Sequence, residues 1–212
     1  ELRTPLTSIR GYLSLFIEDK KEKLDESDLS DLNRISLSAG RLSDLIDTLL
    51  NVSRIERGDF SITAEKVEWI SFAKNQYDLL QASGVQKGIT MQFENPHFEE
   101  IYVNIDPHRI NEVLSNLISN AITFTDRDGH VTVKFQKNDS EIITEISDTG
   151  VGISEEAQKN LFTKFYRVKH SLEMSSPGTG LGLFVSKSII EMHKGKMWVE
   201  SKVGQGSKFY FS

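Results

Sequence analysis

The stretch that decides the fold, residues 110–124, reads INEVLSNLISNAITF. Its apolar residues recur at helical spacing, which predicts an amphipathic helix with one buried face: Ile110, Leu114, Leu117, Ala121 and Phe124. A polar stripe runs beside this face rather than opposite it, through Glu112, Asn116, Asn120 and Thr123. Asparagines at the margin of a buried face need partners, because an unpaired buried amide is costly. Either they cap loops or face water, or their oxygens meet a hydrated metal ion and a phosphate chain.

The sequence that follows this helix predicts a binding site for a flat ring. A strand from Glu141 to Asp148 ends in a carboxylate, and residues 149–153 then read TGVGI. The carboxylate can accept a hydrogen bond from an exocyclic amine, while glycine backbone lets a ring approach closely. A simple Asp-Thr-Gly turn is the alternative interpretation.

A second glycine segment, residues 177–183, reads PGTGLGL and opens the last predicted helix, Leu181 to His193. Its alternating glycines leave backbone N–H groups pointing at an anion, and the helix dipole adds to the attraction. It is not the dinucleotide fingerprint, which should follow a strand, because residues 169–176 are polar and loop-like. We expect the long polar stretch between the two glycine segments to form a mobile lid.

The N-terminal part of the chain has a purely helical pattern. One apolar stripe begins at Leu6 and runs through Ile9, Leu13 and Phe16. A second stripe follows a polar connection and consists of Leu32, Ile35, Ala39, Leu42, Ile46 and Leu49, before Gly58 ends the helix. Two long helices with a short polar turn predict an antiparallel hairpin. Such a hairpin has little core, so we expect it to pair with a second copy as a four-helix bundle; packing on its own chain is the alternative.

The rest of the sequence mixes strands and helices without regular βαβ alternation. Extended segments are predicted at residues 60–67, 89–93, 101–105, 130–136, 141–148, 196–201 and 208–211, and helices at 70–80, 110–124 and 181–193. This order favours helices layered on one face of a mixed sheet. We therefore predict an α+β chain, with the two-helix hairpin in residues 1–57 and an α/β sandwich with a mixed sheet in residues 58–212.

Composition narrows the classes of partner. The 212 residues carry a formal charge of −6 and no cysteine. The negative charge disfavours a nucleic-acid partner, because proteins that bind nucleic acid usually have a basic surface. The absence of cysteine excludes disulfides and thiolate chemistry. No apolar run approaches the ~20 residues of a membrane span. Since the sequence opens Glu1-Leu2-Arg3, we expect a piece of a longer protein, with membrane contact only through other parts of it.

Five segments in order resemble the conserved boxes of the sensor histidine kinases. Residues 1–7 resemble the end of the H box, 116–121 the N box, 148–153 the G1 box, 161–167 the F box and 178–183 the G2 box. The resemblance covers essentially the whole chain. It implies an ATP-binding α/β sandwich, shared with gyrase-type and chaperone ATPases, behind a dimerisation and phosphotransfer bundle, with ATP and Mg²⁺ as cofactors.

The resemblance also implies roles for individual residues of the sandwich. Asn120 would ligate Mg²⁺, Asn116 would lie near the phosphates, and Asp148 would bind the adenine amine. Phe124 would pack on the base, and Ser207 would support Asp148. The remaining nucleotide-binding positions that the boxes imply are Gly150, Gly152, Ile153, Arg167, Gly178, Thr179, Gly180, Leu181 and Gly182.

For phosphoryl transfer, the resemblance places the acceptor histidine immediately before Glu1, so this chain alone is expected not to autophosphorylate. Glu1 would act as a base toward that histidine. Thr4, one helical turn beyond it, would help a water dephosphorylate the partner, the receiver domain of a response regulator. The resemblance further implies a homodimer through the hairpin and a cytoplasmic location, within a parent protein anchored in a bacterial inner or plasma membrane.

One residue departs from the family pattern. The N box usually has a basic residue where Thr123 stands, and losing a charge-assisted contact to phosphate would cost ~1.5–3 kcal/mol unless Lys164 or Arg167 replaced it. Because of this departure, an alternative interpretation is that the protein is a scaffold that binds nucleotide but does not transfer a phosphoryl group. A gyrase-like ATPase is less favoured, because such enzymes place a catalytic glutamate at the position of Asn116.

Overall fold

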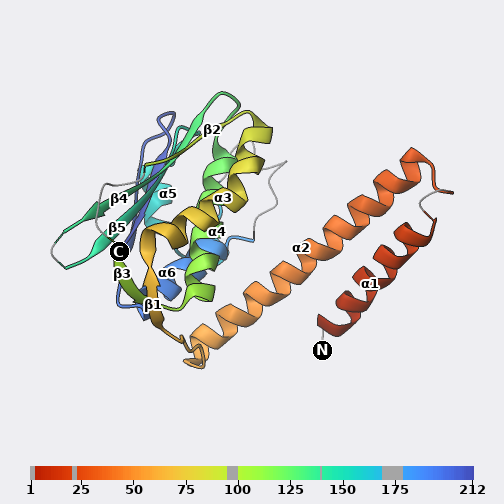
Figure 1. Ribbon diagram of the computed structural model, residues 1–212, viewed down its shortest axis with the longest axis horizontal. Helices are drawn as coiled ribbons and strands as arrows, with labels where there is room; N and C mark the ends of the chain where they lie inside the picture. The colour runs from red at the N-terminus through yellow and green to blue at the C-terminus, as the bar shows by residue number, and fades with distance from the viewer. Residues whose placement is uncertain (1–2, 21–22, 95–99, 139, 169–178) are drawn as a thin grey trace. The chain divides into compact units, whose positions relative to one another are not determined.

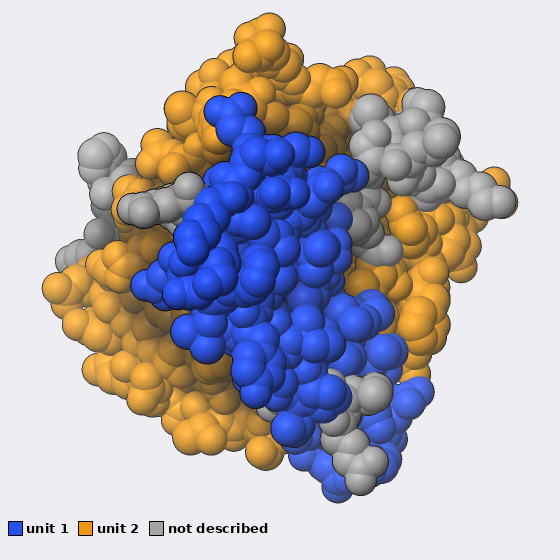
Figure 2. All heavy atoms as spheres, turned by 90° about the vertical axis from the view of Figure 1, so that its right-hand side faces the viewer, with its two compact units in different colours: residues 1–60 blue, residues 61–212 orange. Residues whose placement is uncertain are grey.

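The computed structural model describes residues 3–20, 23–94, 100–138, 140–168 and 179–212. The chain divides into two compact units, residues 1–60 and 61–212, which Figure 2 draws in different colours. Within the described ranges, no helix combines the length and the apolar character that a membrane span requires.

The first unit is a pair of helices, as the sequence predicts. Helices α1 (Arg3–Lys20) and α2 (Glu26–Arg57) lie side by side (Figure 1). The Asp25 side chain begins α2 by accepting a hydrogen bond from the N–H of Asp28 at 2.7 Å. Gly58 ends it in the left-handed conformation, φ 72°, as expected for a glycine that stops a helix.

A single copy of this hairpin covers only part of its apolar stripes. Leu6 and Ala39 are buried. Five other members of the stripes have side chains that are 40–52% exposed: Ile9, Phe16, Ile35, Leu42 and Leu49. The hairpin therefore presents a long apolar surface that its own two helices do not bury.

The second unit contains a five-stranded mixed sheet in the order β2-β4-β5-β7-β6. The strands are β2 (Thr90–Phe93), β4 (His130–Lys137), β5 (Ile142–Asp148), β6 (Met197–Ser201) and β7 (Ser207–Phe211). The β2–β4 pair is parallel and the other pairs are antiparallel. Figure 1 shows the helices α3 (Trp69–Lys87), α4 (Pro107–Phe124) and α6 (Gly182–Met192) on one side of this sheet. The α+β class with a mixed sheet is confirmed.

The core lies between α4, α6 and the sheet. The side chains of Val113, Leu114, Leu117 and Ile118 are fully buried, as are Val131 and Ile146 on the facing strands and Ile189 on α6. The predicted stripe of α4 is thus its buried face, with one exception. Phe124, at the end of the stripe, is 41% exposed.

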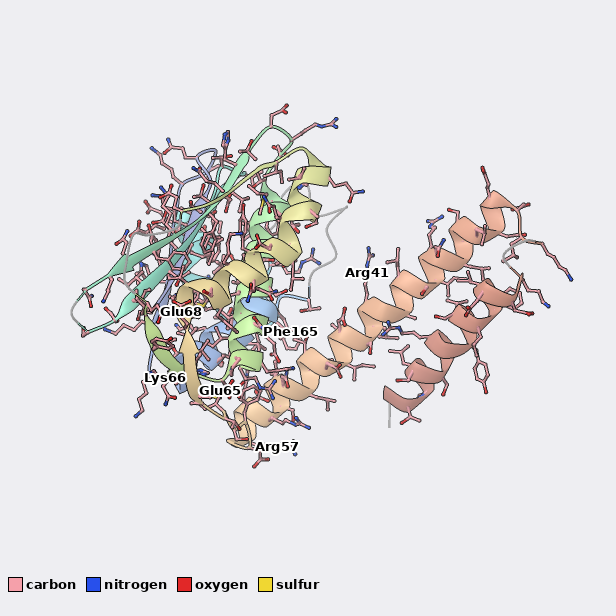
Figure 3. All side chains as sticks on the ribbon, in the orientation of Figure 1. Arg41, Arg57, Glu65, Lys66, Glu68 and Phe165 are labelled. Atoms are coloured by element: carbon pink, nitrogen blue, oxygen red, sulfur yellow. The ribbon has the colours of Figure 1, made fainter. Side chains whose placement is uncertain are left out.

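A small second sheet pairs β1 (Glu65–Glu68) with β3 (Tyr102–Ile105) in antiparallel fashion. The Glu68 side chain, labelled in Figure 3, begins α3 by accepting from the N–H groups of Ile70 and Ser71. Helix α3 continues to Lys87, well beyond the predicted end at residue 80. The prediction ended it too early because apolar positions on its last turns are exposed, which weakens the helical pattern there. The short helix α5 (Glu155–Asn160) was not predicted, although Ser154 caps it.

Hydrogen bonds of Asp106 and His193 stabilise the N-terminus of α4. The carboxylate of Asp106 accepts from the N–H of Thr63 at 2.8 Å and of Arg109 at 3.1 Å. The backbone N–H of Asp106 donates to His193 Nε2 at 2.9 Å, and His193 Nδ1 lies 2.8 Å from the carbonyl oxygen of Ile189. Burial alone would raise the pKa of the Asp106 carboxyl, but these N–H groups outweigh burial and hold the pKa below its usual value.

Candidate functional site

The predicted polar stripe of α4 faces the start of α6. Asn116 and Asn120, both half-buried, are linked by a long hydrogen bond in which Asn120 Nδ2 donates to Asn116 Oδ1 at 3.4 Å. Asn116 Nδ2 donates in turn to Ser186 Oγ on α6 at 2.9 Å. The two asparagines are therefore held from within the protein on one side, and Asn120 Oδ1 is the amide atom that remains for a ligand.

Gly182, the first residue of α6, lies directly under Asn116. A Cβ added at Gly182 would come within 2.5 Å of Asn116 Oδ1, so a larger residue would displace the Asn116 amide from this position. The amide oxygen thus lies at the N-terminal end of α6, where the partial positive charge of the helix favours an oxygen. The same end of the helix is the predicted phosphate-binding position.

Asp148 is buried at the end of β5, with 9% of its surface exposed. The N–H of Gly150 donates to its Oδ1 at 2.8 Å, and the backbone N–H of Ser207 also lies against the carboxylate. Burial raises the pKa of the Asp148 carboxyl above its usual value, and these two N–H groups offset only part of the effect. The hydroxyl of Ser207 lies 2.9 Å from Ser201 Oγ, so the contact of Ser207 with Asp148 is made by the backbone N–H of Ser207.

Gly150 brings this carboxylate next to the end of α4. A Cβ at Gly150 would lie 2.2 Å from the carbonyl oxygen of Phe124 and 2.8 Å from Asp148 Oδ1. The close approach places Asp148 near the backbone of Phe124, the last residue of α4, whose side chain is 41% exposed. Farther along the loop, the N–H of Ile153 donates to Ser201 Oγ at 2.8 Å, and Gly152 turns the chain against Lys202.

The F and G2 segments meet at Gly180. A Cβ there would come within 2.7 Å of the backbone of Phe165, which is labelled in Figure 3 and has a positive φ of 63°. Leu181 is fully buried and anchors the start of α6, and its N–H donates to Thr179 Oγ1 at 3.2 Å. Residues 169–178, which include Gly178 and the later part of the expected lid, lie outside the described residues.

The residues expected to replace a basic group at Thr123 have other contacts. Lys164 Nζ lies 4.9 Å from the centre of the Phe184 ring, and Arg167 is exposed. The sequence analysis missed Lys87, whose Nζ donates to the carbonyls of Ile122 and Thr123 at 2.8 and 2.7 Å. The end of α4 therefore gains a positive charge from α3, which complements the negative end of the helix dipole.

A second residue that the sequence analysis missed is Ser186, because it lies outside every motif and its partner is 70 positions away. Glu1 lies outside the described residues, and Thr4 lies exposed on α1 in the other unit. Contacts thus connect Asn116, Asn120 and Gly182 in one group along the C-terminal half of α4, and Asp148, Gly150 and Phe124 in another at its last residue.

The chemistry of these residues fits a magnesium–nucleotide complex. Among the described residues, no group of three or more His, Asp or Glu could hold a metal ion. Mg²⁺ commonly takes few protein oxygens and completes its shell with waters and phosphate oxygens, so a single amide oxygen such as Asn120 Oδ1 suffices. An acceptor at Asp148, an exposed ring at Phe124 and a helix N-terminus at Gly182 would suit an amine, a base and phosphates.

Comparisons with known proteins agree with both parts of the chain. Residues 105–212 match the family described as histidine kinase-, DNA gyrase B- and HSP90-like ATPase, and residues 1–58 match the His Kinase A (phospho-acceptor) domain. The circadian input-output histidine kinase CikA of Synechococcus elongatus is 34% identical over 99% of this chain and 28% of its own length. The sensor histidine kinase WalK of Bacillus subtilis is 32% identical over 100% of this chain and 34% of its own length.

The fold is also that of a solved histidine kinase. The crystal structure of full-length ShkA with AMPPNP superposes with a TM-score of 0.82 at 24% identity, covering 100% of this chain and 43% of that one. The chain spans about a third of the length of the two curated relatives, 28% and 34%. With its two family domains in this order, the chain belongs to the sensor histidine kinases of two-component systems.

Proposed function

We propose that this chain is the kinase core of a sensor histidine kinase that transfers the γ-phosphoryl group of Mg·ATP to a histidine. The observation that carries the proposal is the set of polar groups at the end of α4. The Asn116–Asn120 pair lies at the start of α6, and Asp148 lies beside Phe124. From the histidine, the phosphoryl group would pass to an aspartate on a response-regulator receiver domain.

The protein's contribution to this reaction is binding and orientation. Asp148 accepts from the adenine amine, Phe124 packs on the base, and the backbone from Thr179 to Gly182 binds phosphates. Asn116 holds Asn120, whose Oδ1 is directed to Mg²⁺. Bound Mg²⁺ supplies charge neutralisation on the phosphates, which is the main requirement of phosphoryl transfer.

The phosphotransfer half of the proposal concerns α1 and α2. In the family motif the acceptor histidine stands before Glu1, which would act as its base, and Thr4 would position a water for dephosphorylation of the regulator. Thr4 is exposed on α1, as a residue that meets a partner must be. The exposed side chains of Arg10 and Tyr12 on the same helix would contribute to the choice of regulator.

The exposed apolar stripes of α1 and α2 support a homodimer. Several of their large side chains are 40–52% exposed in one copy, and a second hairpin would bury them in a four-helix bundle. Residues 1–57 would thus serve dimerisation and phosphotransfer, and residues 58–212 would bind ATP. We place both in the cytoplasm, within a parent protein anchored in the membrane.

The test is phosphorylation of two matched proteins: this chain, and the same chain with one histidine added before Glu1. After incubation with Mg·ATP labelled at the γ-phosphate, acid-labile label should appear only on the protein with the added histidine. At ATP concentrations well below saturation, the label should fall about 10-fold or more when that protein also carries Asp148→Asn. Label on both proteins would contradict the acceptor assignment.

Two alternatives have their own signatures in this experiment. Absence of label on the histidine-bearing protein, with nucleotide binding intact, would identify a scaffold. Steady-state release of inorganic phosphate by either protein would indicate a gyrase-like ATPase. The structure offers no support for the ATPase at Asn116, because an amide cannot take the proton of an attacking water and this amide is bound to Ser186.

A further inference from the structure

Ser186 differs from the other serine in the middle of α6. It is 2% exposed, and its Oγ accepts from Asn116 Nδ2 on α4 at 2.9 Å. Ser188, two residues along, donates to the carbonyl of Phe184 one turn back in its own helix at 2.9 Å. The Ser186 hydroxyl therefore bridges two helices, whereas the Ser188 hydroxyl makes a purely local bond.

Ser186 and the N-terminus of α6 together hold the Asn116 amide in one orientation. With Nδ2 directed to Ser186, the Oδ1 of Asn116 lies over Gly182, where an added Cβ would be only 2.5 Å away. This is the N-terminus of α6, whose partial positive charge favours an oxygen over an NH₂ group. A serine hydroxyl can accept from Nδ2 or donate to Oδ1, so the helix N-terminus selects the orientation and Ser186 holds the amide in it.

The orientation of Asn116 then fixes that of Asn120. Asn116 Oδ1 accepts from Asn120 Nδ2 at 3.4 Å, so the Nδ2 group of Asn120 faces the protein and its Oδ1 faces away. If the Asn116 amide were reversed, Asn120 would instead present its NH₂ group to a ligand. Mg²⁺ binds oxygen and not an amide nitrogen, so the reversed arrangement would repel the metal.

We propose that Ser186 is a positioning residue that orients the Asn116–Asn120 pair so that Asn120 presents its oxygen to the metal of a metal–nucleotide complex. The inference rests on the proposed function, because it assigns Ser186 a part in binding Mg·ATP. Ser186 does not touch the ligand; it acts through two amides in series.

The test compares Ser186→Ala with the matched control Ser188→Ala in the full chain. Alanine suits a helix interior, so both variants should fold. For Ser186→Ala, the affinity for ATP in the presence of Mg²⁺ should fall about 3- to 10-fold, the loss typical of one hydrogen bond. Its affinity for ATP in excess EDTA should change less than about 2-fold, because the phosphate- and base-binding groups are untouched. Ser188→Ala should match the wild type in both measurements.

A second measurement needs no nucleotide. In NMR spectra of the ligand-free protein, the side-chain amide protons of Asn116 should exchange with water slowly in the wild type and in Ser188→Ala, and faster in Ser186→Ala. Equal loss of affinity with and without Mg²⁺, or unchanged amide exchange, would overturn the role of Ser186. A wild-type protein that binds no ATP would overturn the proposed function as well, and the amide measurement would still report separately on the orientation.

Discussion

The two ends of helix α4 use similar side chains in opposite ways. At its N-terminus, Asp106 is a buried carboxylate with hydrogen bonds from Thr63 and Arg109, and these lower its pKa. Near its C-terminus, Asp148 is a buried carboxylate whose pKa is raised because burial outweighs its two N–H contacts. The first end satisfies its polar groups from within the protein, while the second holds the groups that we propose bind the nucleotide.

The exposed ring at the second end fits the same contrast. The apolar face of α4 is buried from Ile110 to Ala121, but the side chain of Phe124, whose backbone lies near Asp148, remains 41% exposed. A buried carboxylate with a raised pKa is costly for a fold, and the cost would fall on binding of a flat base whose exocyclic amine donates to Asp148 and whose ring covers Phe124. Binding sites commonly accept such a local cost.

Replacing the carboxylate at the site end should have the largest effect on ligand binding. Asp148→Asn removes the charged acceptor for the adenine amine, so ATP affinity should fall about 10- to 100-fold, or ~1.5–3 kcal/mol. The free energy of unfolding at pH 7 should stay equal or increase, because the variant removes a buried carboxylate with a raised pKa. Calorimetric titration and chemical denaturation would measure the two quantities, and a clear loss of stability would break the comparison.

The Phe124 ring gives the next effect. Phe124→Ala should weaken ATP binding by ~1–3 kcal/mol, the usual value of stacking a base on an aromatic ring. Unfolding should change little, because the side chain is already 41% exposed. Leu79→Ala is a suitable control, since Leu79 is a 75% exposed apolar residue on α3, and its ATP affinity should equal that of the wild type.

At the other end of α4, the same type of substitution should affect only the fold. Asp106→Asn replaces one of the two accepting oxygens with an NH₂ group that faces the N–H of Thr63 or Arg109, so the free energy of unfolding should fall by ~1–2 kcal/mol. ATP affinity of the folded protein should remain within about 2-fold of the wild type, a change smaller than one hydrogen bond. A tenfold loss of affinity without loss of stability would mean that the two ends are not separate in function.

Lys87 connects α3 to the site end and should give a smaller effect. Lys87→Met removes two hydrogen bonds to the last carbonyls of α4 and should lower the free energy of unfolding by ~0.5–1.5 kcal/mol. Lys74→Met on the same helix breaks an exposed pair with Asp78 and more distant contacts with the rings of Tyr77 and Phe93, and should cost less than ~0.5 kcal/mol. Equal costs for the two variants would show that Lys87 is an ordinary surface lysine.

The pH dependence of stability should separate the two aspartates by sign. Asp106 has a lowered pKa in the fold, so its contribution is present above the unfolded pKa of about 3.9 and is lost as the pH falls through the folded value. Asp148 has a raised pKa, so its contribution is largest below the unfolded value and is lost as the pH rises through the folded value. The advantage of Asp148→Asn should therefore grow from pH 4 to 7, while the disadvantage of Asp106→Asn should shrink below pH 4. Denaturation curves at several pH values would show both trends.

Much of the fold could be predicted because its signals are local. The helical stripe of α4, the glycine that ends α2 and the alternating strands around residues 130–148 all follow from short-range periodicity. Helix α5 escaped prediction because six residues do not establish a period. The end of α3 was set too early because exposed apolar side chains such as Val85 obscure its buried face.

The candidate site divides in the same way. Asn116, Asn120, Asp148 and the glycines could be proposed because they stand in motifs of recognisable spacing. Ser186 and Lys87 could not, because each acts on a residue 35 or more positions away and neither stands in a motif. Contacts between distant segments are fixed by packing, which residue type and spacing alone do not specify.

Hydrogen exchange with and without Mg²⁺ and a non-hydrolysable ATP analogue tests the central contrast most directly. At short exchange times, the analogue should slow exchange in residues 148–153 and in the first turn of α6, and leave the β1–β3 sheet and the first turn of α4 unchanged. Slowed exchange confined to the Asp106 end, or none in residues 148–153 at saturating analogue, would contradict the assignment of nucleotide binding to the Asp148 end.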